Sequence, residues 1–290
     1  MKAFRGADGR VRLFRPEMNM ARLGRTMRAL SLPELDERGF QDAIARLVKV
    51  DSSWIPEGDG FSLYIRPTVI GTQPSLGVGP SSSLKLFAIL CPVGPYYPEG
   101  FKPVRLLAER DAVRAWPGGV GDMKVGGNYA PTIRTQVAAA ARGYAQVLWL
   151  VGKEQTVTEA GTMNFFVLWR TREGRVELIT APLDGTILPG VTRDSMISLA
   201  RGWGEFDVVE RSFTMPELAA AIKEGRVLEA FGAGTAAVVA PVKQLHYGGV
   251  DYDVPIDAAV GAGPVAKRLW KELGDIQYGR TPSKWSVLID

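Results

Sequence analysis

Residues 118–132, "GGVGDMKVGGNYAPT", place a single lysine, Lys124, between two pairs of glycines. Glycine lets the backbone approach other groups closely and adopt positive φ, and it weakens any regular element around it. A solvated surface lysine needs none of these properties. The stretch is therefore either an ordinary loop in which Lys124 is incidental, which is the commoner case, or a backbone shaped around a bulky ligand that Lys124 reaches.

The composition is that of a globular protein with a sizeable core. Of the 290 residues, 46% are hydrophobic and 23% are charged, which suits one large domain or two modest ones. The net charge of +4 is too small to indicate nucleic acid, and no apolar run is long enough to span a bilayer. We therefore expect neither a nucleic-acid partner nor a membrane.

Cysteine and histidine are each present once. Cys91 lies in the apolar run "LKLFAILCPV", so we expect a packed thiol, and both a disulfide framework and a zinc cluster are excluded. We expect no metal at the functional site. His246 has no G-x-S-x-G elbow as a partner, which argues against a serine–histidine hydrolase.

The N-terminal segment is rich in arginine, with seven in the first 28 residues. This composition is typical of a mitochondrial transit peptide. However, "KAFRGADGRVRLF" indicates two strands around a turn at residues 6–9, and a hairpin is a poor amphipathic helix. We therefore expect this segment to belong to the folded body of a cytoplasmic protein. A mitochondrial location would apply if a targeting segment precedes it.

Hydrophobic periodicity and turn residues predict helices mixed with strands. Helices are expected at residues 19–33, 37–51, 131–143, 192–204 and 214–225. Strands are expected in the opening hairpin and at residues 62–72, 84–94, 104–110, 146–152, 162–170 and 175–182. Residues 227–242 indicate either strand–turn–strand or strand–turn–helix.

This mixture predicts an α+β (mixed α/β) protein of two domains. The expected parts are a small domain over 1–94, an interdomain loop over 95–104, where glycine and proline concentrate, and a large domain over 105–290.

Three further stretches bear on Lys124. In "TILPGVTRDSM", Thr192 is a candidate N-cap, and a helix start offers free N–H groups to an anion. In "FGAGTAAV", two glycines followed by Thr235 fit a backbone nest for an oxyanion, whereas the G-x-G-x-x-A match alone is weak support for a dinucleotide. In "TVTEAGTMNFF", Glu159 precedes a hydrophobic strand that would partly bury its carboxylate. Singly, each has an ordinary structural explanation.

Together these stretches fit one ligand, pyridoxal 5'-phosphate. This cofactor needs a lysine for its aldehyde, an anion cradle for its phosphate and an acid facing its ring nitrogen. Glycines around Lys124 would let the backbone lie close to a planar ring. Desolvation in such a pocket lowers the pKa of a lysine, which helps it act as a base.

Six motifs, in this combination, resemble a known family: "YIRPTVIGTQPSLGV", "GDMKVGGNYAPT", "TEAGTMNFF", "LPGVTRDS", "FGAGTAAVVAPV" and "DIQYGR". They are similar to the branched-chain amino acid aminotransferases of the eukaryotic kind, which are fold-type IV pyridoxal phosphate enzymes. The resemblance covers essentially the whole chain. It implies a small N-terminal domain, a larger C-terminal pseudo-barrel domain and a homodimer. It also implies reversible amino transfer between leucine, isoleucine or valine and 2-oxoglutarate, in either the biosynthetic or the degradative direction.

The resemblance also implies roles for individual residues. Lys124 matches the lysine that binds the cofactor aldehyde and carries the substrate proton, Glu159 the acid at the pyridine nitrogen, and Tyr129 the tyrosine bonded to the phenolic oxygen. The phosphate and remaining cofactor contacts match Arg22, Thr162, Val191, Thr192 and Thr235.

The substrate side is implied in the same way. The turn at Thr235 and Ala236 matches the site of the substrate carboxylate. Residues lining the side-chain pocket match Tyr64, Arg66 and Tyr96, and Val78 matches a loop residue that reaches the neighbouring subunit's site.

The chain departs from the family in two places. Ala237 and Ala240 stand where mammalian members carry a redox C-x-x-C, so thiol switching is not expected. Met1 falls where the family has an internal residue, so we expect a shortened small domain with an unpaired strand edge at residues 2–5. The shortened start leaves open a weakly active or noncatalytic cofactor-binding or dimer-interaction protein. Within the same fold, a D-amino acid aminotransferase and an aminodeoxychorismate lyase share the expected roles of Lys124 and Glu159 and are further alternatives.

Overall fold

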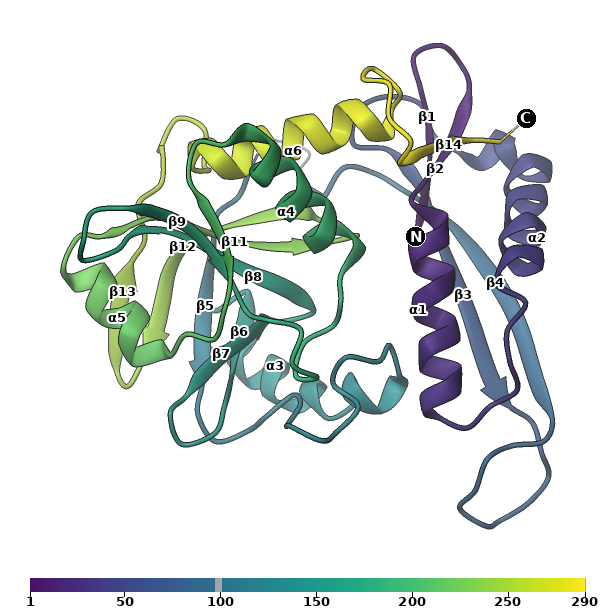
Figure 1. The fold of residues 1–290 in the computed structure, drawn as a ribbon, viewed down its shortest axis with the longest axis horizontal. Helices are drawn as coiled ribbons and strands as arrows, with labels where there is room; N and C mark the ends of the chain where they lie inside the picture. Colours follow the sequence, from purple (N-terminus) through teal and green to yellow (C-terminus); the bar gives the residue numbers. More distant parts are fainter. Residues whose placement is uncertain (97–100, 290) are drawn as a thin grey trace. The chain divides into compact units, whose positions relative to one another are not determined.

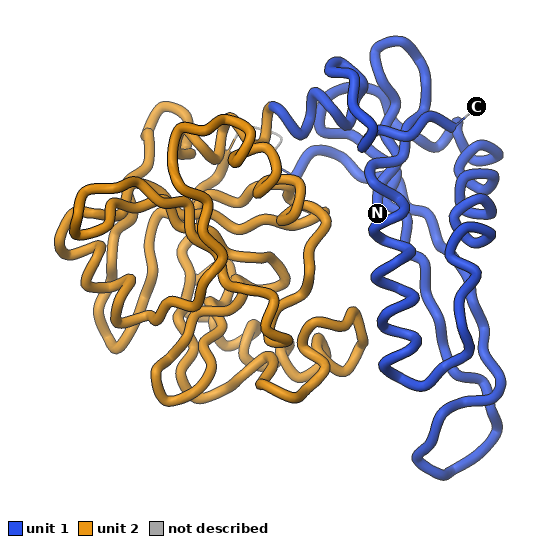
Figure 2. The backbone as a smooth tube through the Cα atoms, viewed as in Figure 1, with its two compact units in different colours: residues 1–98, 272–290 blue, residues 99–271 orange. Residues whose placement is uncertain are grey.

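The computed structural model describes residues 1–96 and 101–289. The chain forms two compact units, residues 1–98 with 272–290 (unit 1) and residues 99–271 (unit 2), shown separately coloured in Figure 2. Part of the interdomain loop expected at 95–104 lies outside the described residues. In the described part of the chain, no helix is long and apolar enough to cross a membrane.

Within the described residues, unit 1 contains a five-stranded sheet in the order β14-β2-β1-β3-β4. Its strands are β1 (Lys2–Arg5), β2 (Val11–Phe14), β3 (Ser62–Gly71), β4 (Leu84–Val93) and β14 (Ser286–Leu288). β1 pairs antiparallel with β2 on one side and with β3 on the other. The expected unpaired edge at residues 2–5 is therefore wrong, because the outer strands of this sheet are β4 and β14.

Two helices complete the core of unit 1, α1 (Pro16–Ala29) and α2 (Glu37–Val50) (Figure 1). Proline in the first turn starts α1, and the Asp36 side chain caps α2 by accepting from the Gly39 amide. Met20 and Ile44 are buried in one cluster with residues of β1, β2 and β3. The short 3₁₀ helix η1 (Ser52–Trp54) follows α2.

Cys91 and the C-terminal segment differ from expectation. Cys91 is exposed rather than packed, because β4 is an edge strand in which no residue is fully buried. Residues 272–290, expected in the large domain, belong to unit 1, because β14 pairs with β2. Strand pairing between distant segments, which local sequence patterns do not specify, decides both outcomes.

Unit 2 is built on a nine-stranded sheet, counted over the described residues, in the order β10-β9-β8-β11-β12-β5-β6-β7, with β13 paired to β12. An additional pairing of β7 with β8 closes six of these strands into a ring, the expected pseudo-barrel. The strands are β5 (Val104–Glu109), β6 (Gln146–Val151), β7 (Thr156–Ala160), β8 (Met163–Arg170), β9 (Val176–Thr180), β10 (Asp207–Glu210), β11 (Val227–Gly234), β12 (Val238–Tyr247) and β13 (Val250–Asp253).

The helices of unit 2 are η2 (Gly126–Asn128), α3 (Thr132–Ala141), α4 (Val191–Trp203), α5 (Met215–Lys223) and α6 (Pro264–Gln277), the last of which crosses into the residues of unit 1. Three of them, α3, α4 and α5, match the expected positions closely, and the two others, η2 and α6, were not expected. Sequence patterns missed α6, together with the short strands β7, β10, β13 and β14. The ambiguous segment at 227–242 is strand–turn–strand.

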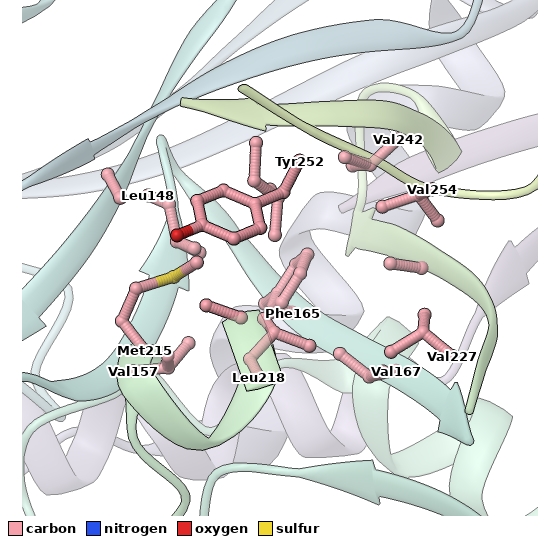
Figure 3. Close-up of a cluster of buried hydrophobic side chains, with 14 of the residues drawn as sticks. Leu148, Val157, Phe165, Val167, Met215, Leu218, Val227, Val242, Tyr252 and Val254 are labelled. Atoms are coloured by element: carbon pink, nitrogen blue, oxygen red, sulfur yellow. The ribbon is translucent and has the colours of Figure 1, made fainter. Parts of the chain in front are cut away.

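The core of unit 2 explains why the ring holds together. β8 is buried along nearly its whole length, so it shows a continuous apolar run instead of the alternation of a half-exposed strand. Phe165 and Val167 of β8 lie among Leu148, Met215 and Leu218 (Figure 3). Burying each such side chain stabilises the fold by about 1.5–3 kcal/mol. This core supports β7 and β8, on whose facing ends the candidate site is built.

Candidate active site

Lys124 lies in the loop between β5 and α3, and its side chain is exposed. Its Nζ donates a hydrogen bond to Tyr129 Oη at 3.1 Å and lies 4.9 Å from the centre of the Tyr129 ring. Its positive charge also acts on the carboxyl of Glu159. The structure thus brings together the three residues on which the cofactor hypothesis depends.

The glycines around Lys124 have different functions. A Cβ at Gly121 would lie 2.5 Å from Ala115 Cβ and 2.7 Å from Gly185 O, so close packing requires glycine there. A Cβ at Gly126 or Gly127 would meet nothing within 4 Å, so these two leave open space. Gly118 has a φ of 81°, which favours glycine. The loop is therefore packed on the side before Lys124 and open on the side after it.

Asn128 holds the same loop from within. It is buried, and its Nδ2 donates to Val120 O at 2.6 Å and to Met123 O at 2.8 Å. Sequence patterns did not single out Asn128. Its buried side-chain amide satisfies backbone carbonyls of the glycine-rich loop that would otherwise be unpaired. These bonds fix the backbone immediately before Lys124.

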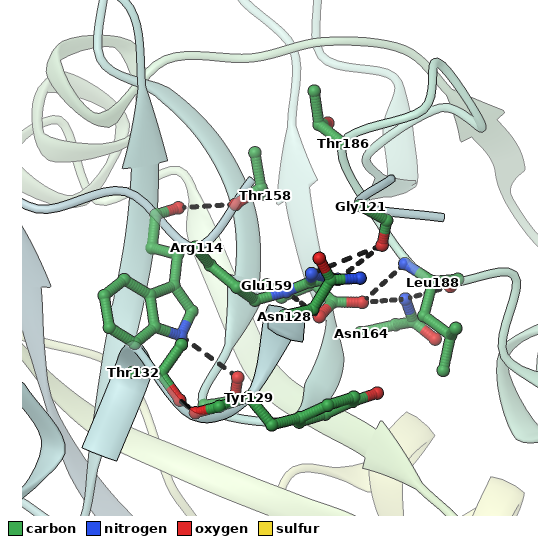
Figure 4. A network of polar contacts seen from close by, with 12 residues as sticks. Arg114, Gly121, Asn128, Tyr129, Thr132, Thr158, Glu159, Asn164, Thr186 and Leu188 are labelled. Atoms are coloured by element: carbon green, nitrogen blue, oxygen red, sulfur yellow. Dashed lines mark hydrogen bonds and ion pairs between the residues drawn. The ribbon is translucent and has the colours of Figure 1, made fainter. Parts of the chain in front are cut away.

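Glu159 is buried, with 3% of its surface exposed, and three donors bind its carboxylate (Figure 4). Arg114 Nε donates to Oε2 at 2.6 Å, while the Leu188 amide at 2.8 Å and Asn164 Nδ2 at 3.1 Å donate to Oε1. Burial raises the pKa of Glu159, and Arg114, the Leu188 amide and Lys124 oppose that rise. The acid is more deeply buried than its sequence context predicted.

Asn164 joins the acid to the next loop. It faces Glu159 across the β7–β8 pair, and its Nδ2 also donates to Leu188 O at 2.9 Å. A Cβ at Gly190 would clash with Asn164 Oδ1, so glycine is required where the chain enters α4. Thr162 lies exposed in the tight turn between β7 and β8, beside Gly161, which has a φ of 60°.

The N-terminus of α4 is a candidate anion site, but its N-cap residue differs from the prediction. Gly190 is the N-cap residue and supplies no side-chain hydrogen bond, whereas Val191 and Thr192 are already helical. The predicted N-cap role of Thr192 is therefore wrong, because the extended Gly190 lets the helix begin one residue before Thr192. The first-turn amides of this 13-residue helix remain suited to an anion.

The turn after β11 is the second candidate anion site. Thr235 is half-buried and Ala236 is exposed in this turn, which ends at Val238 with a φ of 61°. Gly232 and Gly234 lie within β11 itself, and a Cβ at either would press on Met163. The G-x-G-x-x-A pattern thus reflects close packing within a β-hairpin, which differs from the strand-to-helix turn of a dinucleotide site.

The other five candidates belong to unit 1. Arg22 in α1 donates through Nη2 to Asn19 Oδ1 at 3.3 Å. On β3, the Arg66 guanidinium lies 5.6 Å from the centre of the Tyr64 ring. Val78, in the β3–β4 loop, and Tyr96 are exposed.

Comparisons with known proteins give a consistent result. The family model of class IV amino-transferases matches residues 2–245. A branched-chain-amino-acid aminotransferase of Dictyostelium discoideum is 55% identical over 291 residues, covering 100% of this chain and 76% of the relative. A mitochondrial one of Rattus norvegicus is 50% identical over 291 residues, covering 100% and 73%. Other curated relatives are named as cytosolic.

A solved structure agrees in fold over the full length of the chain. It is the branched-chain amino acid aminotransferase from Thermobaculum terrenum in its PLP-form, which aligns with a TM-score of 0.80 and 22% identity. The alignment covers 100% of this chain and 87% of that one. At this level of identity, the likeness shows a common fold.

Proposed function

The chain belongs to the class IV amino-transferases, and on this premise we propose that it transfers amino groups between branched-chain L-amino acids and 2-oxoglutarate with pyridoxal 5'-phosphate as its cofactor. Identities of 50–55% over the whole chain to branched-chain-amino-acid aminotransferases of the eukaryotic type support the substrate class. The observation that carries the proposal is the grouping of Lys124, Tyr129 and the buried Glu159 in unit 2.

The residues present fit this cofactor. An exposed amine lies beside a phenol, as the aldehyde and the phenolic oxygen require. The three donors on Glu159 leave it acceptor capacity for the ring nitrogen, since an ionised carboxylate can accept about four hydrogen bonds. The first turn of α4 and the turn at Thr235 offer backbone amides for the phosphate and the substrate carboxylate. When bound, the cofactor withdraws electrons from the substrate α-carbon and so makes its proton acidic.

Lys124 is the residue proposed to move that proton. Its Nζ is the basic atom that removes the proton from the α-carbon of the amino acid. Tyr129 Oη orients Nζ through the 3.1 Å hydrogen bond, and Asn128 holds the backbone that carries the lysine. Gly126 and Gly127, which lie between Lys124 and Tyr129 in the chain, have open space beside them, and this space leaves room for the planar ring of the cofactor.

Glu159 is proposed to hold positive charge on the cofactor ring nitrogen. A fixed carboxylate in a dry site interacts more strongly with charge than a solvated one, because the site does not reorganise during the reaction. Arg114 and Lys124 favour the ionised form that this role requires, against the burial that raises the pKa of Glu159.

Unit 1 is proposed to supply the substrate side. From the family resemblance, we propose that Tyr64, Arg66 and Tyr96 bind the substrate side chain and that Arg22 binds the phosphate. In a homodimer, Val78 would reach the partner subunit's site, which agrees with its exposure. We propose a cytoplasmic location. Sedimentation of the purified chain tests the dimer.

The experiment mixes the purified chain with pyridoxal phosphate, L-leucine and 2-oxoglutarate and measures glutamate. We expect glutamate to form with leucine, isoleucine and valine, and not with D-alanine. Preference for D-alanine would contradict the branched-chain assignment. A cofactor absorbance without glutamate would indicate a noncatalytic cofactor-binding protein.

A further inference from the structure

Arg114 is an unusual residue in its segment of chain. It lies in an irregular stretch between β5 and the Lys124 loop, where most neighbours are at least partly exposed, yet only 5% of its own surface is exposed. A buried guanidinium is costly unless its N–H groups find partners. The hydrogen-bond partners of the Arg114 guanidinium therefore indicate which parts of the site this segment holds in place.

The guanidinium binds two parts of the site at once (Figure 4). Nε donates to Glu159 Oε2 at 2.6 Å, and Nη1 and Nη2 donate to Gly121 O at 3.2 and 2.9 Å. Gly121 precedes Lys124 by three residues. One rigid, planar group thus connects the buried acid on β7 to the loop that carries the lysine.

The surrounding contacts give this link little freedom. On the acid side, the Leu188 amide and Asn164 fix the other carboxylate oxygen. On the loop side, Asn128 holds Val120 O and Met123 O, the carbonyls that flank the Gly121 contact. A Cβ at Gly121 would also meet Ala115, the neighbour of Arg114, at 2.5 Å.

We propose that Arg114 is a positioning residue that sets the carboxylate of Glu159 and the backbone before Lys124 in one fixed arrangement, so that a single cofactor ring can meet both. The inference rests on the proposed function and adds to it a residue that touches neither substrate nor cofactor. Arg114 acts through Glu159 and through Gly121. A lysine at position 114 has a single ammonium in place of the planar guanidinium, so it cannot bind Glu159 and the Gly121 carbonyl in their present geometry.

The test uses Arg114→Lys and Arg114→Gln in the full chain, with Arg12→Lys as the matched control. Arg12 is 7% exposed and likewise binds a carboxylate, that of Asp8, and a carbonyl, Arg10 O, but it lies in the hairpin of unit 1. Four quantities are measured: the melting temperature without cofactor, the Kd for pyridoxal phosphate, kcat, and KM for leucine.

We expect Arg114→Lys to weaken pyridoxal phosphate binding about tenfold and to lower kcat about 10²-fold, with KM for leucine within about threefold. Arg12→Lys should leave kcat and the Kd for the cofactor within about twofold, whatever its effect on melting. Equal effects of Arg12→Lys and Arg114→Lys on kcat and Kd would overturn the positioning role. So would Arg114 variants that melt below about 25 °C without cofactor, since Arg114 would then be a folding residue.

A double variant separates positioning from mere stability. If Arg114 acts through Glu159, Arg114→Gln combined with Glu159→Gln should have a kcat within about threefold of Glu159→Gln alone. Fully multiplied losses would overturn the proposed action through Glu159, since they would show that Arg114 works independently of that acid. If the wild-type chain makes no glutamate, the proposed function fails, but the cofactor Kd still tests Arg114. If the wild type makes glutamate and Arg114→Lys has the same kcat and the same Kd for the cofactor, the inference about Arg114 fails while the proposed function stands.

Discussion

Unit 2 and unit 1 hold their polar candidate residues in different ways. In unit 2, Glu159 is buried on β7, a strand of the closed ring, and hydrogen bonds from Arg114, Asn164 and Leu188 fix it. In unit 1, the sheet is open, and Arg66 and Tyr96 are exposed. A buried, multiply bonded group has one geometry, whereas an exposed side chain keeps rotamer freedom. The difference supports the proposal that Glu159 of unit 2 takes part in the chemistry and that unit 1 supplies an adaptable substrate side.

The largest effect should come from Lys124→Ala. With no amine at this position, the covalent link to the cofactor and the substrate base are both absent, so glutamate formation should fall to background. Borohydride reduction of the cofactor-loaded wild type should label one peptide, the one that contains Lys124. Lys153→Ala, a change at an exposed turn of the same unit, serves as the control and should keep full activity. Labelling of a different lysine would contradict the assignment.

Glu159→Gln should have the next largest effect. The amide cannot hold a proton on the ring nitrogen as a carboxylate does, so cofactor should still bind while kcat falls roughly 10²–10³-fold. The control is Glu177→Gln in β9, a buried acid whose Oε2 accepts from Trp169 Nε1 at 3.1 Å. If Glu159→Gln and Glu177→Gln lower kcat equally, the loss comes from disturbed packing in unit 2. The proposed chemical role of Glu159 would then be wrong.

The sequence predicted the parts of this molecule that depend on local patterns. The alternation of helices and strands, the opening hairpin and the loop around Lys124 all follow from turn residues and periodicity. The N-cap of α4 is Gly190, two residues before the predicted Thr192, because an extended glycine precedes the helix without a side-chain cap. Element boundaries are sensitive to such small backbone differences.

What the sequence did not predict depends on distant partners. Arg114 stands in "DAVRAWPGG", where nothing marks it as buried, and its carboxylate partner lies 45 residues further along the chain. The exposure of Cys91 and the pairing on both sides of β1 depend on which strands meet across the sheet. Such pairings become visible only when the chain is folded, so sequence analysis of a single chain finds motifs more readily than the residues that position them.

Lys2 offers a test of unit 1 alone through pH. Burial lowers the pKa of Lys2 from 10.5 to about 8. Between these values the unfolded chain binds more protons than the folded one, so the stability of unit 1 should rise with pH across this window, and the destabilisation is complete below about pH 8. Lys2→Met should stabilise unit 1 by up to about 3 kcal/mol near pH 7, with a gain that shrinks toward pH 10.5.

Chemical unfolding of the full chain at about pH 7 and about pH 10 measures this difference. Lys49→Met, at an exposed position of α2, is the matched control for the loss of a lysine charge. A gain from Lys2→Met that is the same at both pH values would mean that the methionine stabilises by packing and that the charge of Lys2 costs nothing in the folded sheet.

The smallest effect should come from Arg66→Ala, and it tests the recognition assigned to unit 1. We expect Arg66 to meet the distal carboxylate of 2-oxoglutarate, so its loss should raise KM for 2-oxoglutarate about tenfold, equivalent to about 1.4 kcal/mol. KM for leucine, whose side chain has no charge, should change less than about twofold. An exposed ion pair is worth only about 0–1 kcal/mol, so a loss of the expected size would mean that the bound acid is shielded from water. Arg66→Lys should raise KM for 2-oxoglutarate less than Arg66→Ala does, because lysine keeps the charge without the planar guanidinium.

Equal changes in both KM values would show that Arg66 shapes the pocket instead of binding the carboxylate. Tyr64, whose ring lies 5.6 Å from the guanidinium, would then be the next residue to change, through Tyr64→Phe.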